Sequence, residues 1–435
     1  FFLMILRPPR STLFPYTTLF RSSPYAHAKI LSIDVSAAKA LKGVHDVITG
    51  DYYTKRGGLY LEDKNFLAVN TVKFCGEPVV AVAAETPEIA EAACDLVKVE
   101  YEPLPVINNP MEGMAKDAIL IHPELHTYKV VPIFHPQAHT NISHHHIIRK
   151  GDADAAFKYA EEHPDEYYIT EHEYHVPHVQ HTPIENHIAV AQYEPDGKCT
   201  VWASCQSPYA VRQALSASFD IPLNKMRIIS PYVGGGFGAK AGTTIEGIII
   251  PLAMHSKGRP VMMEYTREEE FVNSYVRQGL YTKIKTAVRK SDGKFLAVQN
   301  NFYWDGGAYT EYGVNIVKAS GFASTGPYEF DNVKTDAYCV YTNNPVGGPY
   351  RGFGMCEIHF GIEQNIDEVA KEIGMDPIEI RRVNGLAPGK STGTGEIMKS
   401  CGFLEALDQV AEAIQYDKPC DPPSGPHKVR GKGVI

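Results

Sequence analysis

Short apolar runs and alternating stretches divide the first quarter of the chain into compact elements. The run Pro78–Ala84 (PVVAVAA) is uniformly apolar, which is typical of a buried strand. Thr86-Pro87-Glu88 then offers a capping hydroxyl, a proline suited to the first helical position and an early acid, so we predict a helix to about Val97. The alternating SPYAHAKILSIDVS lies before these elements and the strand VKVEYE follows them. Together they predict a small α/β domain that ends near Tyr101.

Strand-like and helix-like patterns alternate along the later part of the chain. Ser291-Asp292-Gly293 separates two strand-like runs and is typical of a hairpin turn. Apolar residues then recur at helical spacing from Ile362 to Ile373, and Gly374 stands where a C-terminal cap belongs. Asp376-Pro377 predicts the start of a second helix, and FLEALDQVAEAI from Phe403 predicts a third. This mixture predicts the α+β fold class.

Residues 103–150 show no sustained period and are rich in Pro, Asn and His. We interpret them as a long connector between two domains. The three consecutive histidines, His144–His146, could bind a metal, but a histidine cluster in a polar connector more often belongs to a solvated loop.

The opening stretch has the wrong order of features for a secretion signal, because its apolar run Phe1–Leu6 comes before Arg7 and Arg10. It is also too short to span a membrane, which takes about 20 apolar residues. Read back into codons, TLFPYTTLFRS (residues 12–22) resembles a widely used sequencing adapter. We therefore interpret residues 1–22 as a non-native segment outside the fold, and expect a cytoplasmic protein.

Composition narrows the functional classes. A chain of 435 residues with 44% hydrophobic and 21% charged residues is expected to form two or more globular domains. Its net charge of -9 includes no long block of like charge, which argues against nucleic acid or an anionic membrane as the main partner. The eight cysteines include no C-x-x-C spacing, so buried free thiols are expected rather than a zinc site or an iron-sulfur cluster.

Two glycine clusters could let a ligand approach the backbone closely: Val233–Lys240 (VGGGFGAK) and Gly347–Gly354 (GGPYRGFG). A phosphate-binding P-loop is excluded for the first, because Ala239 and Ala241 stand where glycine and Ser or Thr are needed. A dinucleotide-binding loop for an NAD-dependent dehydrogenase fits Gly234–Ala239 as G-x-G-x-x-A, although Glu264 lies too far along the chain. A glycine turn at a packed sheet end would explain one cluster but not both.

Six motifs carry a resemblance to a known family. In chain order they are SPYAHAKILSIDVSAAKAL, WASCQSPYAVRQAL, VGGGFGAK, DGGAY, NNPVGGPYRGFG and MDPIEIRRVN. In this order they resemble the molybdopterin-binding subunit of the xanthine dehydrogenase and aldehyde oxidase family. The resemblance implies a small α/β hammerhead domain at residues 23–102, the connector at 103–150, and a large mixed α/β molybdopterin-binding region. Its first domain would span residues 151–388, and its second would start at 389–435.

The resemblance also implies roles for individual residues. Gln206 matches a glutamine whose amide donates to an oxo ligand of molybdenum, while Phe237 and Gly238 match residues that approach the metal centre. Gly235 and Gly236 would shape the loop for the pterin, and Arg351 matches a position in the lining of the metal pocket. Phe353 matches an aromatic that stacks on the substrate. Without the resemblance, Gln206 reads as a loop amide bonded to the backbone, Arg351 as a surface or phosphate-binding residue, and Phe353 as a core aromatic.

Two departures from the purine-oxidising members bear on the substrate. Those members carry glutamate and arginine where this chain has Ala241 and Ala319, which argues against xanthine and favours an aldehyde, an N-heteroaromatic or another small planar substrate. No side chain here is expected to bind the metal directly. The catalytic glutamate of the family lies near the C-terminus of a longer subunit, so we expect no catalytic base on this chain, and no activity from it in isolation.

The family further implies the cofactor and the partners. The cofactor would be molybdenum-molybdopterin, in its cytosine dinucleotide form, and water would supply the oxygen atom. Iron-sulfur clusters and FAD are expected on partner subunits. The second molybdopterin-binding half would be missing through truncation or carried by a separate chain. A non-catalytic fragment remains an alternative function, beside the NAD-dependent dehydrogenase.

Overall fold

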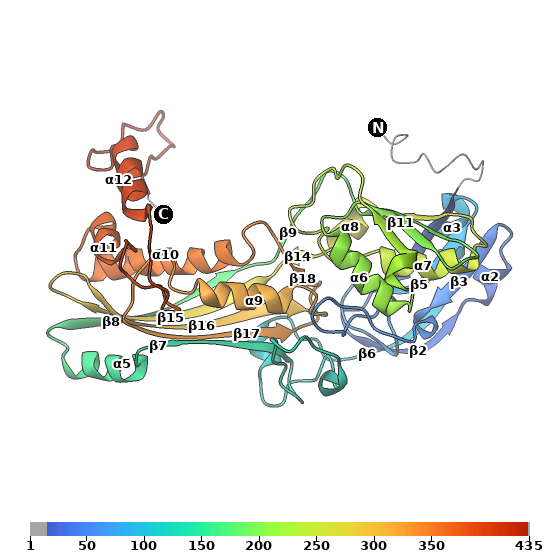
Figure 1. The fold of residues 1–435 in the computed structure, drawn as a ribbon, viewed down its shortest axis with the longest axis horizontal. Coiled ribbons are helices and arrows are strands. Elements are labelled where there is room, and N and C mark those ends of the chain that lie inside the picture. Colours follow the sequence, from blue (N-terminus) through green and yellow to red (C-terminus); the bar gives the residue numbers. More distant parts are fainter. Residues whose placement is uncertain (1–14, 434–435) are drawn as a thin grey trace.

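Two large sheets organise the two ends of the molecule, and a small sheet lies between them (Figure 1). The computed structural model describes residues 15–433. Strands and helices mix along the whole of this range, as the α+β prediction requires. No helix in it is long and apolar enough to cross a membrane.

The larger sheet has seven strands in the order β12-β11-β10-β13-β1-β5-β3. The bounds of these strands are Met226–Ile229, Cys199–Ala203, Ile188–Tyr193, Val261–Glu264, Tyr16–Ser22, Pro78–Ala84 and Val44–Thr49, in the same order. Two separate parts of the sequence therefore share one sheet. The predicted strand at Pro78–Ala84 is confirmed, and all seven of its residues are buried.

Strand β1 corrects the interpretation of residues 1–22 as a segment outside the fold. Tyr16–Ser22 lies inside the sheet, antiparallel to β5 and parallel to β13. The physical reason is its alternation: Phe20 packs into the core on one face, and Leu19 packs against the core on the other. Thr17 and Thr18 add β-branched residues that favour a strand. The non-native origin of residues 1–22 stays a prediction, and residues 1–14 lie outside the described residues.

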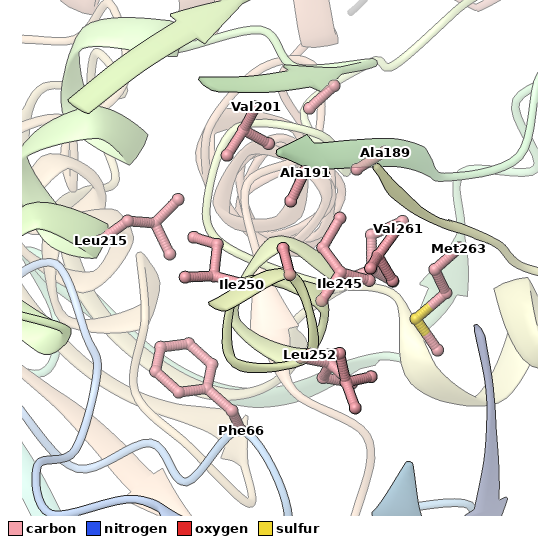
Figure 2. Packing of buried hydrophobic residues seen from close by; sticks show 14 of the residues in the cluster. Phe66, Ala189, Ala191, Val201, Leu215, Ile245, Ile250, Leu252, Val261 and Met263 are labelled. Atoms are coloured by element: carbon pink, nitrogen blue, oxygen red, sulfur yellow. The ribbon is translucent and has the colours of Figure 1, made fainter. Parts of the chain in front are cut away.

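Helix α7 (Glu246–His255) fills the core beneath this sheet. Its residues from Glu246 to Ala253 are all buried, because neighbouring elements cover the helix on every side. Figure 2 shows Ile250 of this helix on the side that faces Ala191 and Val201 of the sheet, whereas Leu252 lies on the other side of the helix. This core supports the strands from which the first glycine cluster extends.

The opposite face of β1 and β5 is covered by α3 (Pro87–Leu96), which confirms the predicted helix. Thr86 caps it, since its hydroxyl accepts a hydrogen bond from the Ile89 N–H. A three-stranded sheet in the order β4-β2-β6 completes this part of the molecule. Its strands, and the short helices beside it, are β4 Thr71–Val72, β2 Ala28–Asp34, β6 Lys98–Pro103, α2 Ser36–Ala40 and the 3-10 turn η1 Gly50–Tyr52.

The five-stranded sheet has the order β7-β17-β16-β15-β8. Its strands are β7 Ile142–Lys150, β17 Asn332–Tyr341, β16 Phe295–Gly307, β15 Gly279–Arg289 and β8 Tyr167–Val176. The predicted hairpin at Ser291-Asp292-Gly293 is confirmed, because β15 and β16 pair antiparallel on either side of it.

Helices cover both faces of this sheet (Figure 1). Helix α5 (Ala153–Glu162) lies on one face, and α9 (Gly313–Phe322) and α10 (Met355–Glu372) lie on the other. The predicted helices near the C-terminus are confirmed as α10, α11 (Pro377–Asn384) and α12 (Phe403–Ala413), and Asp376 caps α11. The remaining helices are α4 Pro110–Gly113, η2 Leu125–Thr127, α6 Pro208–Ser218, η3 Leu223–Lys225 and α8 Arg267–Asn273.

The prediction of a connector at residues 103–150 is wrong at its C-terminal end, where β7 pairs with β17 along nearly its whole length. His144–His146 therefore lie on a strand and not in a solvated loop. His144 is fully buried with its ring edge-to-face against Phe134, and burial lowers its pKa to about 3. Pairing with β17 satisfies the backbone N–H and C=O groups of β7, so this segment forms a strand although it is rich in histidine.

A buried carboxyl links the segment around residue 63 to the five-stranded sheet. Asp63 Oδ2 accepts hydrogen bonds from the Thr310 N–H and the Tyr341 hydroxyl, both at 2.7 Å. Burial raises the pKa of Asp63 to about 6, although these hydrogen bonds oppose the shift. The folded protein therefore holds this proton more tightly than the unfolded chain, in which the pKa of aspartate is about 3.9.

We expect Asp63→Asn to stabilise the protein at pH 7.5. The folded-state pKa is raised, so wild-type stability falls as pH rises from about 4 to about 6, by about 2–3 kcal/mol in total. An asparagine accepts the same two hydrogen bonds and has no charge to bury. Urea unfolding of both proteins at pH 5 and pH 7.5 measures the effect, and the variant's advantage should shrink at pH 5. An advantage that does not change with pH would contradict the titration of Asp63.

Candidate functional site

The candidate site lies at a small sheet with the order β18-β14-β9 (Figure 1). This sheet lies between two lobes, one built on the seven-stranded sheet and the other on the five-stranded sheet. Its strands are Gly347–Gly348, Val276–Arg277 and Val179–Gln180, in that order. The second glycine cluster begins with β18, and the first follows β12 of the seven-stranded sheet. Elements from both lobes thus bring the two clusters together.

Gln206 lies beneath the first glycine cluster, with its side-chain carbonyl fixed by the backbone. Its Oε1 accepts hydrogen bonds from the N–H groups of Gly238 at 2.9 Å and Lys240 at 3.3 Å. A Cβ on Gly236 would lie 2.5 Å from the same oxygen, so only glycine permits this approach. Because the carbonyl is occupied, the amide Nε2 is left to donate to a ligand.

The first cluster adopts a conformation that exposes its backbone donors. Gly235, Phe237 and Gly238 all have positive φ, at 105°, 51° and 112°. Among residues 15–433, no acceptor receives the N–H groups of Gly235, Gly236 or Phe237. Consecutive free N–H groups of this kind suit an anionic or strongly polar ligand.

The two glycine clusters are joined backbone to backbone. The Arg351 N–H donates to the Phe237 carbonyl at 2.9 Å. A Cβ on Gly238 would lie 2.0 Å from the carbonyl oxygen of Pro349, so the chains touch without room for a side chain. The structure therefore places Gln206, Phe237, Gly238 and Arg351 together, although they come from separate parts of the sequence.

Arg277 supports the second cluster from strand β14. Its guanidinium lies 4.0 Å from the centre of the Tyr350 ring and donates to the Arg351 carbonyl at 3.3 Å. Its Nε also lies 3.3 Å from a carboxylate oxygen of buried Glu357. Burial raises the pKa of Glu357, and the nearby Arg277 opposes that shift. The guanidinium of Arg277 thus holds the second cluster, because it stacks on Tyr350 and also pairs with Glu357.

An ion pair supports the first cluster. The ammonium of Lys240 lies 2.7 Å from both the backbone carbonyl and a carboxylate oxygen of Glu185. The same carboxylate accepts the Gly234 N–H at 2.8 Å, so Glu185 ties both ends of the glycine loop. Burial lowers the pKa of Lys240, and Glu185 opposes this shift.

Two histidines reinforce these loops from below. His187 lies between Glu270, at 2.9 Å from Nδ1, and the Ala239 carbonyl, at 3.2 Å from Nε2. Burial alone would raise the pKa of Glu270, but hydrogen bonds from His187 bring it below its usual value. His181 donates through Nε2 to the Pro349 carbonyl at 2.8 Å and stacks on Tyr350.

Phe353 lies at the edge of the site and not in the interior of the core. It has a positive φ of 52° and is half-buried. Its ring meets Tyr312 edge to face, with centroids 6.2 Å apart, and the Tyr312 hydroxyl lies 3.5 Å from the Ala241 carbonyl. The two rings and Ala241 form an apolar border beside the glycine loops.

These residues fit a molybdopterin cofactor. Gln206 Nε2 and three free backbone N–H groups are neutral donors, which suit the oxygen and phosphate atoms of such a group. Within the described residues, no three His, Cys, Asp or Glu side chains gather in a way that could hold a metal ion. The site thus offers hydrogen-bond donors to the polar atoms of a bound cofactor.

The geometry argues against a dinucleotide-binding loop. In such a site the glycine loop runs directly into a helix, whose N-terminus binds the pyrophosphate. Here α7 begins only at Glu246, after the turn that contains Gly242 and Thr244. The glycine loop instead packs on Gln206 and on the second cluster.

Sequence reasoning missed the supporting roles of three residues: Glu185, Arg277 and Tyr312. The sequence gives Glu185 no role, because its pairing with Lys240 spans 55 positions along the chain. No local spacing reports such a contact. The one usable signal was Lys240 itself, since a lysine in a glycine loop needs either an anionic ligand or an acidic partner.

Family models match most of the chain. Residues 12–105 match the a/b hammerhead domain of aldehyde oxidase and xanthine dehydrogenase, and residues 134–385 match the molybdopterin cofactor-binding domain. Both matches begin earlier than the boundaries expected from sequence. The first includes β1, and the second includes β7.

Individual relatives agree with these models. The chain is 34% identical over 412 residues to the nicotinate dehydrogenase large molybdopterin subunit of Eubacterium barkeri, covering 93% of this chain and 91% of that one. It is 30% identical over 415 residues to the nicotine 6-hydroxylase large subunit of Paenarthrobacter nicotinovorans, covering 91% of this chain but only 48% of that protein. The chain thus spans about half the length of the second relative.

A solved structure shows the same fold. The aldehyde oxidoreductase of Desulfovibrio gigas superposes with a TM-score of 0.82 at 25% identity, covering 92% of this chain and 43% of that one. The predicted order of a hammerhead domain and then a molybdopterin-binding domain is therefore confirmed. The chain belongs to the molybdopterin-binding subunits of the xanthine dehydrogenase and aldehyde oxidase family.

Proposed function

We propose that this chain is the cofactor-binding catalytic subunit of a molybdenum hydroxylase. Its substrate is an aldehyde, an N-heteroaromatic or a related small planar molecule, and water is the oxygen source. The observation that carries the proposal is the arrangement at Gln206, whose carbonyl is held by the Gly238 and Lys240 N–H groups while its amide remains free. That amide lies beside free backbone donors at two joined glycine loops.

The chain's own residues hold the cofactor in place and take no part in the reaction themselves. When bound, the molybdenum cofactor supplies a Lewis acid and a two-electron acceptor. Gln206 donates to it without carrying a charge, and the N–H groups of Gly235, Gly236 and Phe237 hold its polar atoms. Arg351 and Gly238 keep the second loop against the first. The cofactor's cytosine dinucleotide form remains part of the proposal.

The border of the site suits a planar, weakly polar substrate. Phe353 and Tyr312 present aromatic surface, and Ala241 beside them adds no hydrogen-bonding side chain; Ala319, at the second position that differs from the purine-oxidising members, is likewise apolar. A flat ring or a small aldehyde can pack against such a surface. A purine would find no charged group at either alanine.

In this proposal no residue of the described range 15–433 acts as the catalytic base. Two carboxylates beside the loops are both engaged, Glu185 with Lys240 and Gly234, and Glu357 with Arg277. A base must be free to accept a proton from the reacting group. The isolated chain is therefore inactive in this proposal.

Exposed apolar side chains beside the loops support a macromolecular partner here. Phe237 is 48% exposed, Ile184 94%, Tyr209 83% and Tyr232 89%. Each lies in or next to a segment that shapes the glycine loop or Gln206, and contiguous exposed apolar surface marks interaction sites. We propose that a second molybdopterin-binding half covers them, and that iron-sulfur and FAD subunits carry electrons away. The Eubacterium barkeri relative is itself named as a subunit.

Metal and pterin analysis of the chain co-produced with its partner subunits tests the proposal. Molybdenum and a pterin should purify with the chain in equal amounts. Finding neither would reject the hydroxylase. Tight NAD binding in their place would support the dehydrogenase, and binding of neither cofactor would support a non-catalytic fragment.

We expect Gln206→Glu to lower turnover by about 10²–10³-fold, the usual effect of losing one donor to a developing charge. The carboxylate still accepts from Gly238 and Lys240, so the loop should keep its shape and its melting temperature. The free donor, however, becomes an anionic acceptor. Turnover per bound molybdenum is the measurement, and a variant with full turnover would remove Gln206 from the cofactor's partners.

A further inference from the structure

A cavity of about 700 Å³ lies between the β4-β2-β6 sheet and the segment 104–128. It shares no lining residue with the glycine loops. Its walls come from β2, β4, the chain around residues 53–56, and the turn before η2. Neither the proposed hydroxylase activity nor the family match gives this space a role.

The cavity is strongly basic in an acidic protein. Four cations line it, Lys29, Lys55, Arg56 and Lys73, against one carboxylate, Glu124. The chain as a whole has a net charge of -9. A cationic hollow on an anionic molecule favours the entry of anions.

Three of these cations already have carboxylate partners. Lys29 pairs with Glu102, Lys55 with Asp220, and Arg56 with Glu124 at 3.4 Å. These pairs are largely exposed, so solvent screens them and they can exchange partners at little cost.

Lys73 is the exception, because it is buried and poorly satisfied. It is 7% exposed, and among residues 15–433 no carboxylate oxygen lies within 4.0 Å of its ammonium. Its one hydrogen bond, to the Thr71 hydroxyl, is 3.4 Å long, and the Tyr309 ring centre lies 5.6 Å away. A buried ammonium has three donors and normally binds acceptors with all of them.

The buried carboxylate of Glu77 does not fill this need. Glu77 accepts a hydrogen bond from the backbone N–H of Lys73 and another from the Tyr309 hydroxyl, so both of its oxygens are used away from the ammonium. Burial lowers the pKa of Lys73, and Glu77 opposes that shift. An anion in the cavity would supply the missing acceptor.

The remaining walls combine polar side chains with apolar and aromatic ones. Leu104, Ile119 and Val69 line the cavity together with the rings of Tyr53 and Tyr128. The guanidinium of Arg56 lies 4.7 Å from the centre of the Tyr128 ring. The lining therefore places cationic and apolar surface side by side, which suits a small molecule that carries an anionic group on an apolar body.

We propose that this cavity binds a small organic anion, with its carboxylate or phosphate group against Lys73 and Arg56 and its apolar part against Tyr53 and Leu104. The two anionic groups share the same chemistry, since each offers several oxygen acceptors to a cation. The site lies where the small N-terminal domain meets the segment that follows it. Occupancy would therefore also stabilise that junction.

Calorimetric titration of the purified chain, assembled with its partners, tests the site. Benzoate and phenyl phosphate are the probes, with inorganic phosphate and neutral benzamide as comparisons. We expect saturable binding at millimolar concentration or tighter for both organic anions, and about ten- to hundred-fold weaker binding to Lys73→Met, because a hydrogen bond to a charged group is lost.

Lys158→Met is the matched control, since Lys158 is 76% exposed on α5 and far from the cavity lining. It should bind as the wild type does. If Lys73→Met does not fold, Arg56→Gln takes its place with the same expected direction. Equal binding of benzamide, equal binding by the cavity variant, or binding of inorganic phosphate alone would each overturn the proposal.

Discussion

Gly238→Ala is expected to uncouple the two glycine loops and to abolish retention of the cofactor. A Cβ at this position would lie 2.0 Å from the Pro349 carbonyl oxygen and 2.6 Å from its carbon. Both atoms belong to backbone, so neither can rotate away. The φ of 112° adds strain, because side chains rarely adopt this conformation. The Arg351–Phe237 hydrogen bond beside it should break, and free donors of both loops should shift.

Gly258→Ala is the control that separates the effect of backbone strain from the effect of the steric clash at Gly238. Gly258 has a φ of 87° but nothing within 4 Å of its would-be Cβ, so this variant carries backbone strain alone. It should lose about 1–2 kcal/mol of stability and keep its cofactor. Thermal melting and molybdenum content of both variants are the measurements. If Gly238→Ala kept a full complement of molybdenum, the contact between the loops would not matter for binding.

Local structure was largely predictable because its causes are local. Thr86 caps α3 and Asp376 caps α11 through hydrogen bonds to N–H groups within three residues, so sequence spacing alone reports them. The hairpin at Asp292 and the helical face from Ile362 follow from turn chemistry and a regular period. These features depend on little outside their own segment.

Strand β1 shows how a resemblance can mask a sound local pattern. Its Thr-Thr-Leu-Phe run has the alternation and β-branching of a strand, although the same residues resemble a translated adapter. It lies between β5 and β13, where its absence would leave one edge of each strand without hydrogen-bond partners, since β5 otherwise pairs only with β3 and β13 only with β10. Phe20 and Leu19 each complete a core on their own side.

The candidate site likewise contains residues that could be predicted from the sequence and residues that could not. The residues that resemblance identified, Gln206, Gly238 and Arg351, do meet, but their supports could not be inferred from spacing. Arg277 reaches Glu357 and Tyr350 only because β14 and β18 are neighbours in the small sheet. Long-range pairing of this kind depends on the fold as a whole, and a single sequence records it nowhere.

Glu185→Gln is expected to destabilise the protein by about 3 kcal/mol, because it leaves the ammonium of Lys240 buried without a counter-charge. The Lys240 side chain is 0% exposed and that of Glu185 is 21% exposed. Glutamine keeps the shape and can still accept from Gly234, so the loss is mainly of charge. Urea unfolding measures the difference, and molybdenum content should fall with it as the glycine loop loosens.

The dependence on pH identifies the cause. Burial lowers the pKa of Lys240 and Glu185 opposes that shift, so the variant should have a still lower pKa at Lys240. Between that lowered pKa and about 10.4, the unfolded chain binds more protons than the folded one, and stability must rise with pH. The difference in unfolding free energy between the variant and the wild type should therefore become smaller as pH increases through that range. If this difference does not change with pH, the lost stability comes from altered packing and not from the uncompensated charge of Lys240.

Two further variants complete the argument. Glu171→Gln removes the acid from an exposed pair with Lys283, whose side chains are 44% and 41% exposed, and should change stability by less than about 1 kcal/mol. In the double variant Glu185→Gln with Lys240→Met, no charge remains buried, so much of the lost stability should return. Recovery of stability without recovery of molybdenum would show that the pair serves the loop's shape as well as its folding. Additive losses in the double variant would mean that the two residues do not act as a pair.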